Sequence, residues 1–152
     1  RVIRAIEVMT VSGKSIREHE AESLREPCPY HVIELGLRYH DRETLYGRIN
    51  RRVDKMVEMG LTEEVKAARE QGLTATAAQA IGCKELYSWL DGKETQEEAL
   101  EKLKQSTRRY AKRQLTWFGT DQRMRWIEPD TLAAGETPLD KAMEILEKEG
   151  MA

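Results

Sequence analysis

The segment from Gln105 to Phe118, QSTRRYAKRQLTWF, constrains the fold of this chain more than any other stretch. Its apolar residues recur at helical spacing, which predicts one amphipathic helix whose apolar side continues back to Leu103. The segment also carries four cations and no carboxylate: Arg108, Arg109, Lys112 and Arg113. Cations three or four residues apart lie on one broad helix face and repel each other. Either carboxylates from elsewhere in the fold or a phosphate-bearing partner would relieve that repulsion, and charge alone leaves both interpretations open.

The composition permits one helix-rich domain, and the sequence concentrates unbalanced positive charge in one region. The chain has 152 residues, of which 39% are hydrophobic and 34% charged, with a net charge of −2. Between residues 102 and 125, however, eight cations stand against Asp121 alone, and these are Lys102, Lys104, Arg108, Arg109, Lys112, Arg113, Arg123 and Arg125. Such local clustering is typical of nucleic-acid contact even where the overall charge is neutral.

Neither the apolar residues nor the cysteines indicate a membrane segment or a metal centre. No apolar run approaches the length of a membrane span, and no signal-peptide pattern is present. Cys28 and Cys83 fit neither a metal-ligand spacing nor a disulfide framework. Free thiols in a reducing cytoplasm are the simplest interpretation.

Periodicity and capping residues predict a mainly helical chain with about two short strands. We expect a well-buried helix over 1–10, a mobile connector over 18–29, strands over 31–38 and 123–127, and a loop over 73–79. Further helices are expected from Asp41 to Met59, from a Thr62 cap to Gly72, over 81–90, from the Thr95 cap to Phe118 and over 138–149. Because nothing near 31–38 can form a hairpin with it, its partner strands are expected outside this sequence, in a longer protein.

The tetrapeptide SGKS at 12–15 looks like the end of a phosphate-binding loop. That loop needs another glycine where this chain has Val8, and it needs a preceding strand where the pattern is helical. We therefore interpret Ser12-Gly13 as a helix stop and assign no nucleotide site there.

Three separated stretches carry a resemblance to a known family: LYGRINRRVDKMVEMGL, QAIGCKEL and RRYAKRQLTWF. Together they resemble the C-terminal part of tRNA dimethylallyltransferases, in order from Arg1 to about Trp126. The resemblance implies an α/β parent enzyme with a P-loop-like parallel sheet and helices. Residues 1–30 would be the end of a helical tRNA-binding insertion and a connector, and 31–152 the C-terminal part of the catalytic core with helical tRNA-binding elements. The phosphate-binding loop and catalytic Asp that open such enzymes are not in this sequence.

The resemblance also implies a reaction and its partners. The parent enzyme would move a dimethylallyl group from dimethylallyl diphosphate to N6 of the adenosine 3′ of the anticodon, in the cytoplasm. Its partners would be the tRNA anticodon stem-loop, the prenyl diphosphate and the N-terminal half of the same enzyme, without which this part would be inactive. Mg²⁺ would be the cofactor, with ligands outside this chain, and the full-length protein would be a monomer.

The site residues follow from the same resemblance. Arg52, in INRRV, would contact the donor diphosphate, for which the planar guanidinium is suited. The tRNA-binding residues would be Arg1, Arg4, Gln79, Gly82, Lys84, Arg109, Lys112, Arg113, Gln114 and Trp117.

Several of these residues have simpler interpretations. Arg1 and Arg4 suit ordinary surface charge, Arg52 suits a surface salt bridge, and Gly82 suits a plain loop glycine. Trp117 could stack on a base, but its helical spacing from Leu103 and Ala111 favours a core position. Cys83 departs from the family, which usually has an aromatic residue there.

A second class of function remains open: a stand-alone helical module that binds RNA or protein without catalysis. An upstream Gly-rich phosphate-binding loop in the reading frame would distinguish the enzyme from this module.

Overall fold

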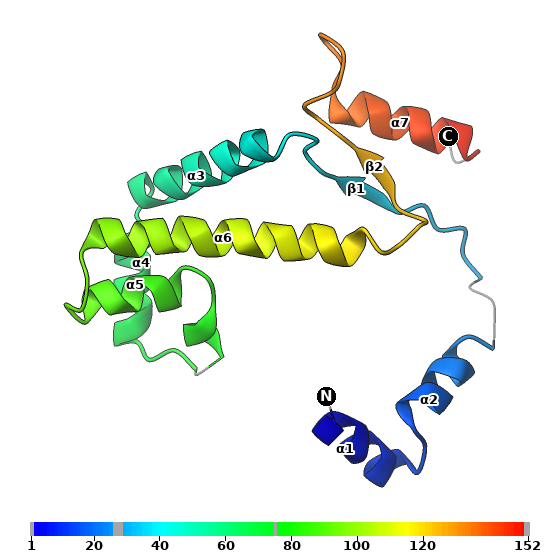
Figure 1. Ribbon diagram of the computed structural model, residues 1–152, viewed down its shortest axis with the longest axis horizontal. Coiled ribbons are helices and arrows are strands. Elements are labelled where there is room, and N and C mark those ends of the chain that lie inside the picture. Colours follow the sequence, from blue (N-terminus) through cyan, green and yellow to red (C-terminus); the bar gives the residue numbers. More distant parts are fainter. Residues whose placement is uncertain (1, 26–28, 75, 151–152) are drawn as a thin grey trace. The chain divides into compact units, whose positions relative to one another are not determined.

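The computed structural model describes residues 2–25, 29–74 and 76–150. The chain divides into two compact units, Arg1–Val32 and Ile33–Ala152 (Figure 1). The described residues are mostly helical, and their two short strands form one parallel sheet. The expected fold class is therefore confirmed. The assignment of the first unit to a tRNA-binding insertion stays a prediction.

The first unit contains α1, Val2–Ser12, and α2, Ile16–Ser23. The helix stop at Ser12-Gly13 is confirmed, since α1 ends at Ser12 and Gly13 has φ +70°. The mobile connector expected over 18–29 is wrong for 18–23, which is helical because Ser15 and Glu18 form a capping box. That Ser-x-x-Glu signal was present in the sequence. Pro27 and Cys28 lie outside the described residues.

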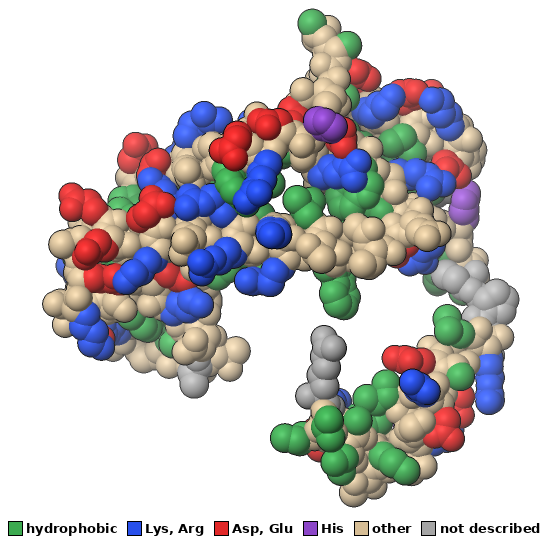
Figure 2. All heavy atoms as spheres, in the orientation of Figure 1, with side chains coloured by type: hydrophobic (Ala, Val, Ile, Leu, Met, Phe, Trp, Pro, Cys, Tyr) green, Lys and Arg blue, Asp and Glu red, His purple; other side chains and the backbone are tan. Residues whose placement is uncertain are grey.

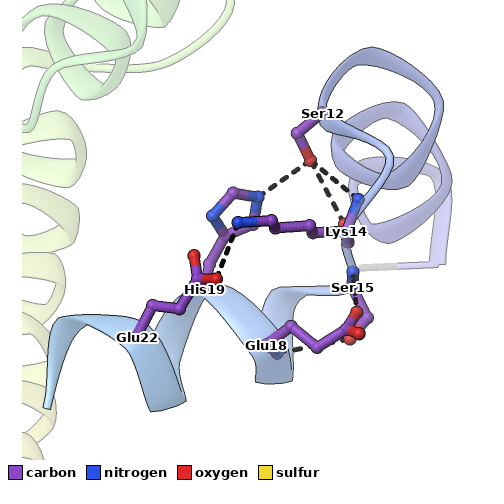
Figure 3. A network of polar contacts seen from close by, with 6 residues as sticks. All are labelled: Ser12, Lys14, Ser15, Glu18, His19 and Glu22. Carbon is purple, nitrogen blue, oxygen red and sulfur yellow. Dashed lines mark hydrogen bonds and ion pairs between the residues drawn. The ribbon is translucent and has the colours of Figure 1, made fainter. Parts of the chain in front are cut away.

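Polar contacts join the two helices at their turn (Figure 3). The Ser12 hydroxyl lies 2.8 Å from Nε2 of His19, and Lys14 Nζ lies 2.6 Å from Oε1 of Glu22. The backbone N–H of Ser15 donates to Glu18 at 2.6 Å. Residues 12–15 thus stabilise the turn between α1 and α2.

The prediction that α1 is well buried is wrong within this unit. Its largest apolar side chains are more than half exposed: Val2, Ile3, Ile6, Met9 and Val11. The cause is the composition of α2, IREHEAES, which offers almost no apolar surface to pack against.

The second unit is built around the long helix α6, Gln96–Phe118. Helices α3, Arg42–Glu58, and α5, Cys83–Leu90, both pack along α6, and α4, Leu61–Glu70, contacts α3 and α5 (Figure 1). A short 3₁₀ helix, η1, Ala77–Gln79, precedes α5 where a loop was expected. The core of this bundle is formed by Val65, Leu86 and Ala99, and Val53 on α3 and Leu103 on α6 are also buried.

The helix boundaries follow the predicted caps with one exception. Asp41 caps α3 by accepting the N–H groups of Glu43 and Thr44, and Thr95 caps α6. Thr62, expected as the cap of α4, instead lies inside that helix and is 5% exposed. The helix begins two residues earlier than a Thr62 cap implies, because Gly60, with φ +99°, both ends the turn after α3 and precedes α4.

The strands β1, Leu35–Leu37, and β2, Arg125–Ile127, pair in parallel with Gly36 opposite Trp126. Both are shorter than predicted. The expectation that β1 finds its neighbours only outside this sequence is wrong, since β2 is a neighbour; parallel strands need no hairpin, only a long crossover such as α3 to α6. Gly36 is required at this pair, because a Cβ there would lie 2.7 Å from the Trp126 ring. Helix α7, Pro138–Lys148, packs against β2.

Candidate functional site

The cations of the first half of α6 are all paired with carboxylates. Lys102 bonds Glu94, which raises the pKa of Lys102, and Lys104 Nζ lies 2.6 Å from Oδ1 of Asp54 on α3. Arg108 pairs with Glu101 at 3.1 Å and donates to Oδ1 of Asn50 at 2.7 Å.

Arg108 is therefore a structural residue that ties α6 to α3. Its guanidinium also lies 5.9 Å from the centre of the Tyr46 ring on α3, and its side chain is only 20% exposed. Among the four cations of Gln105–Phe118, Arg108 is thus neutralised by a carboxylate within the fold.

The next three cations of α6 behave differently. Arg109, Lys112 and Arg113 are exposed, and none of them has an ion pair with another described residue. Arg113 lies over the Tyr110 ring at 5.7 Å. Figure 2 shows the same contrast: red and blue side chains mix at the end where α6 begins, whereas blue side chains gather without red over its middle.

Trp117 lies beside these cations and is 75% exposed. The core position favoured for this residue is therefore wrong, because the apolar side of α6 is formed by Leu103 and Ala111 and nothing described covers the following turn. With Lys112, Arg113 and two threonines, Trp117 lines a shallow hollow of about 460 Å³. A flat aromatic ring beside cations suits a nucleotide of single-stranded RNA.

Gln114 is exposed but belongs to a different surface. It lines a groove of about 320 Å³ beside β1 and β2, together with Leu37, Phe118 and Trp126. The structure thus separates Gln114 from the hollow of Trp117, and its predicted RNA contact stays a prediction.

Three of the predicted tRNA-binding residues lie at the turn before α5 or at the start of that helix. Gln79 ends η1 and is exposed, and Lys84 is half-exposed on the first turn of α5. Gly82 is buried with φ +106°, and its N–H donates to Oε2 of Glu85 at 3.0 Å. Sequence reasoning missed Glu85, although Gly-x-x-Glu ahead of an apolar run has the spacing of a helix cap.

Arg52 lies on α3 and faces away from α6. Asn50 and Asp54, which contact α6, are each two residues from Arg52, or about 200° around the helix. Arg52 is exposed and has no ion pair among the described residues, so the surface salt bridge considered for it is not formed there. Its neighbours Arg51 and Lys55 are exposed too, while Arg48 lies over Tyr39 at 5.3 Å.

The first unit contributes one described candidate. Arg4 is exposed and lies 3.5 Å from Glu7, an i,i+3 contact that suits ordinary surface charge. Arg1 lies outside the described residues.

Within residues 2–25, 29–74 and 76–150, no group of three or more His, Cys, Asp or Glu side chains could hold a metal ion. In the same ranges, no helix has the length and apolar content needed to cross a membrane. Cys83 is a free thiol.

Comparison with known proteins identifies the family of this chain. A family model described as IPP transferase matches residues 1–121. The tRNA dimethylallyltransferase of Halalkalibacterium halodurans is 46% identical over 129 residues, which cover 84% of this chain and 41% of that protein. The tRNA dimethylallyltransferase of Shouchella clausii is 45% identical over 152 residues, which cover 100% of this chain and 48% of that protein.

Solved structures agree with the sequence matches. A tRNA delta(2)-isopentenylpyrophosphate transferase of Staphylococcus epidermidis superposes with a TM-score of 0.71 at 39% identity, covering 97% of this chain and 48% of that one. The full-length tRNA isopentenylpyrophosphate transferase of Bacillus halodurans gives a TM-score of 0.70 at 37% identity, covering 96% of this chain and 50% of that one. The chain thus spans about half the length of its relatives. By these matches the chain belongs to the IPP transferase family.

Proposed function

We propose that this chain is the RNA-binding and diphosphate-contacting part of a tRNA dimethylallyltransferase. The whole enzyme would transfer a dimethylallyl group from dimethylallyl diphosphate to N6 of the adenosine 3′ of the anticodon. Membership of the family and the names of the relatives support the reaction class.

The change in charge pairing along α6 is the main support for the proposal that this chain binds RNA. The first three cations of the helix have carboxylate partners, and the next three, Arg109, Lys112 and Arg113, have none among the described residues. An exposed Trp117 stands next to the unpaired set. Phosphates would neutralise the cations and a base would cover the ring, so an RNA strand fits both features.

The proposed reaction places only a few steps on this chain. N6 of the adenosine attacks C1 of the dimethylallyl group, the C1–O bond to the diphosphate breaks, and the N6 proton passes to a base in the preceding part of the enzyme. Negative charge grows on the leaving diphosphate, and Arg52 would stabilise it through paired N–H donors. The exposure of Arg52 and its lack of a carboxylate partner among the described residues leave its guanidinium available.

The remaining residues would hold the tRNA so that its adenosine can leave the stack and reach the donor. Lys84 and Arg113 suit phosphates, while Gln79 and Gln114 suit base edges or 2′-hydroxyls. Arg1, Arg4 and Gly82 complete the proposed set. Mg²⁺ would lower the charge of the diphosphate when bound; the described residues gather no ligand set for it, and no step above depends on it. A cytoplasmic monomer, with Cys83 reduced, completes the proposal.

The test requires a complete enzyme. We define the reconstituted enzyme as this chain joined to the preceding part of the Halalkalibacterium halodurans relative. It should attach one dimethylallyl group to an anticodon stem-loop RNA that carries adenosine 3′ of the anticodon, as seen by mass spectrometry. An RNA with that adenosine moved by one position is the matched control. This chain alone should bind the stem-loop without modifying it. Failure of the reconstituted enzyme to modify the stem-loop, where the intact relative succeeds, would contradict the proposal.

A further inference from the structure

Glu85 is a carboxylate that the fold buries. It is 6% exposed, although carboxylates are rarely buried unless they are paired or hydrogen-bonded. Its Oε2 accepts the N–H of Gly82 at 3.0 Å. Its Oε1 has no hydrogen-bond partner among the described residues, and Lys84 Nζ stands 3.8 Å away.

The bond to Gly82 closes a turn that other residues would not readily adopt. Gly82 has φ +106° and ψ −56°, a conformation that side chains other than glycine rarely take. A Cβ on Gly82 would meet nothing within 4 Å, so backbone conformation, not crowding, requires glycine here. On the other side of Glu85, Leu86 is 0% exposed and fixes α5 in the core against Val65 and Ala99. Glu85 therefore connects a rigid helix to the turn that precedes it.

Helix capping alone does not explain this arrangement. The helices α2, α6 and α7 begin with capping boxes whose carboxylates, on Glu18, Glu98 and Asp140, are exposed and are matched by a hydroxyl from the cap residue. Glu85 has no such hydroxyl to bond with, because its cap is a glycine, and one of its oxygens stays unsatisfied. A buried unsatisfied oxygen lowers stability, so its presence calls for an explanation beyond capping, of which a functional role is one.

We propose that Glu85 is a positioning residue for RNA binding, which holds the Gly82 turn so that Gln79 and Lys84 are presented to the RNA in a fixed geometry. This inference rests on the proposed function, in which that turn contacts tRNA. A turn that is already ordered spares the RNA the cost of selecting it from many conformations. The Gly82 N–H and the nearby Lys84 would offset the negative charge of Glu85, which would otherwise repel phosphates.

Two substitutions of Glu85 in the reconstituted enzyme isolate this role. Glu85→Ala removes the acceptor, and Glu85→Gln keeps an oxygen for the Gly82 N–H. Glu98→Ala is the matched control, because it removes the same kind of bond, from Thr95 N–H at 2.8 Å, at a helix start outside the candidate site. Thermal unfolding establishes that each variant is folded, and fluorescence anisotropy gives its Kd for the anticodon stem-loop.

Glu85→Ala should raise the Kd for the stem-loop and the KM for tRNA by about 5- to 10-fold, with kcat and the KM for dimethylallyl diphosphate unchanged. Glu85→Gln should stay within about twofold of wild type, as should Glu98→Ala, since neither loses the Gly82 bond. If Glu85→Ala binds RNA as Glu98→Ala does, the inference is overturned and the proposed function stands. If Glu85→Ala does not fold, Glu85→Met, which also removes the acceptor but fills the buried space, takes its place in the same comparison. If the wild-type enzyme binds no stem-loop RNA, the proposed function fails, and the inference fails with it.

Discussion

The two parts of α6, residues 96–108 and residues 109–118, differ in sequence and in surroundings, because the first part contains glutamates and the second contains no carboxylate. The first part carries Lys102, Lys104 and Arg108, and each of them has a carboxylate partner within the fold. The second part carries three further cations that have none among the described residues. The division falls between two adjacent arginines, Arg108 and Arg109, which point to different faces of the helix because neighbours along a helix are about 100° apart.

This difference shows that charge counts along a sequence overstate the free charge of a fold. Of the eight cations between 102 and 125, Arg123 pairs with Asp121 and Glu34, and Arg125 pairs with Glu149. What remains for a partner is the short run from Arg109 to Arg113. Paired cations should therefore matter for stability, and unpaired ones for binding and catalysis.

The largest effect is expected from an unpaired cation outside α6. Arg52→Ala in the reconstituted enzyme should lower kcat/KM for dimethylallyl diphosphate by roughly 10²-fold or more, about 2–4 kcal/mol, because charge on the leaving group loses its partner. Arg52→Lys should recover only part of the loss, since an ammonium cannot bind two oxygens in a plane. Steady-state kinetics with each substrate varied in turn measure this. Donor kinetics unchanged in Arg52→Ala would show ordinary surface charge.

Trp117 and Trp126 differ in the same way, since the first ring is exposed and the second packs within the fold. Trp117→Ala should weaken binding of the anticodon stem-loop by about 1–3 kcal/mol, the value of one stacked base, and leave the melting temperature nearly unchanged because the ring is exposed. Trp126→Ala is the reciprocal control, since that ring packs over Gly36 and lies 5.3 Å from the Arg38 guanidinium. It should lower the melting temperature more than Trp117→Ala does. Equal RNA affinity in wild type and Trp117→Ala would remove this residue from the site.

Arg108 is the last paired cation of α6 and Arg109 is the first that has no ion pair with another described residue, so the two should differ in their effects on stability and on RNA binding. Arg108→Ala should destabilise the fold by roughly 1–2 kcal/mol, because it leaves Asn50 and Glu101 without their charged donor. Arg109→Ala should leave the free energy of unfolding unchanged and weaken RNA binding instead. Urea unfolding and anisotropy on the two variants measure both effects. If the two arginines behaved alike in both assays, the division of α6 would have no energetic meaning.

The smallest effect is a pH dependence of stability from a paired carboxylate. Hydrogen bonds from Lys141 and then Lys148 lower the pKa of Glu144 from 4.5 to about 2. Because the pKa is lower in the folded state, this contribution is complete above about pH 4.5 and is lost as the pH falls toward 2. Glu144→Gln should therefore reduce the fall in melting temperature over that range, whereas Glu147→Gln, which alters a neighbour without a described partner, should not. The effect is small because the group is well solvated.

Much of the local structure could be predicted from the sequence. Asp41, Thr95 and the Thr137-Pro138 pair mark the starts of α3, α6 and α7, because caps act through bonds within four residues. The capping box of Ser15 and Glu18 marks the start of α2 in the same way. The charged residues and prolines that follow nevertheless led to the prediction of a connector there. Errors at Thr62 and in the length of β1 are of the kind expected where a neighbouring glycine or strand sets the boundary.

Contacts distant in sequence could not be predicted in this way. The pairing of β1 with β2 joins residues about 90 positions apart, and no local pattern specifies a parallel partner. The exposure of Trp117 and the burial of Glu85 depend likewise on which faces of α6 and α5 the other helices cover. Helical spacing gives the angle of a side chain around its own axis, but it does not show where the neighbouring helix lies.

The salt dependence of RNA binding shows whether Arg109, Lys112 and Arg113 contact phosphates. Anisotropy of the anticodon stem-loop with the reconstituted enzyme gives the slope of log K against log salt for three proteins. These are wild type, the triple variant of Arg109, Lys112 and Arg113 to Ala, and a control with the paired Lys102 and Lys104 changed to Ala. Each phosphate contact contributes about 0.7–0.9 to the slope, so the triple variant should be flatter by roughly 2–3 units, while the control keeps the wild-type slope. A triple variant with the wild-type slope, or a control that flattens as much, would contradict the account.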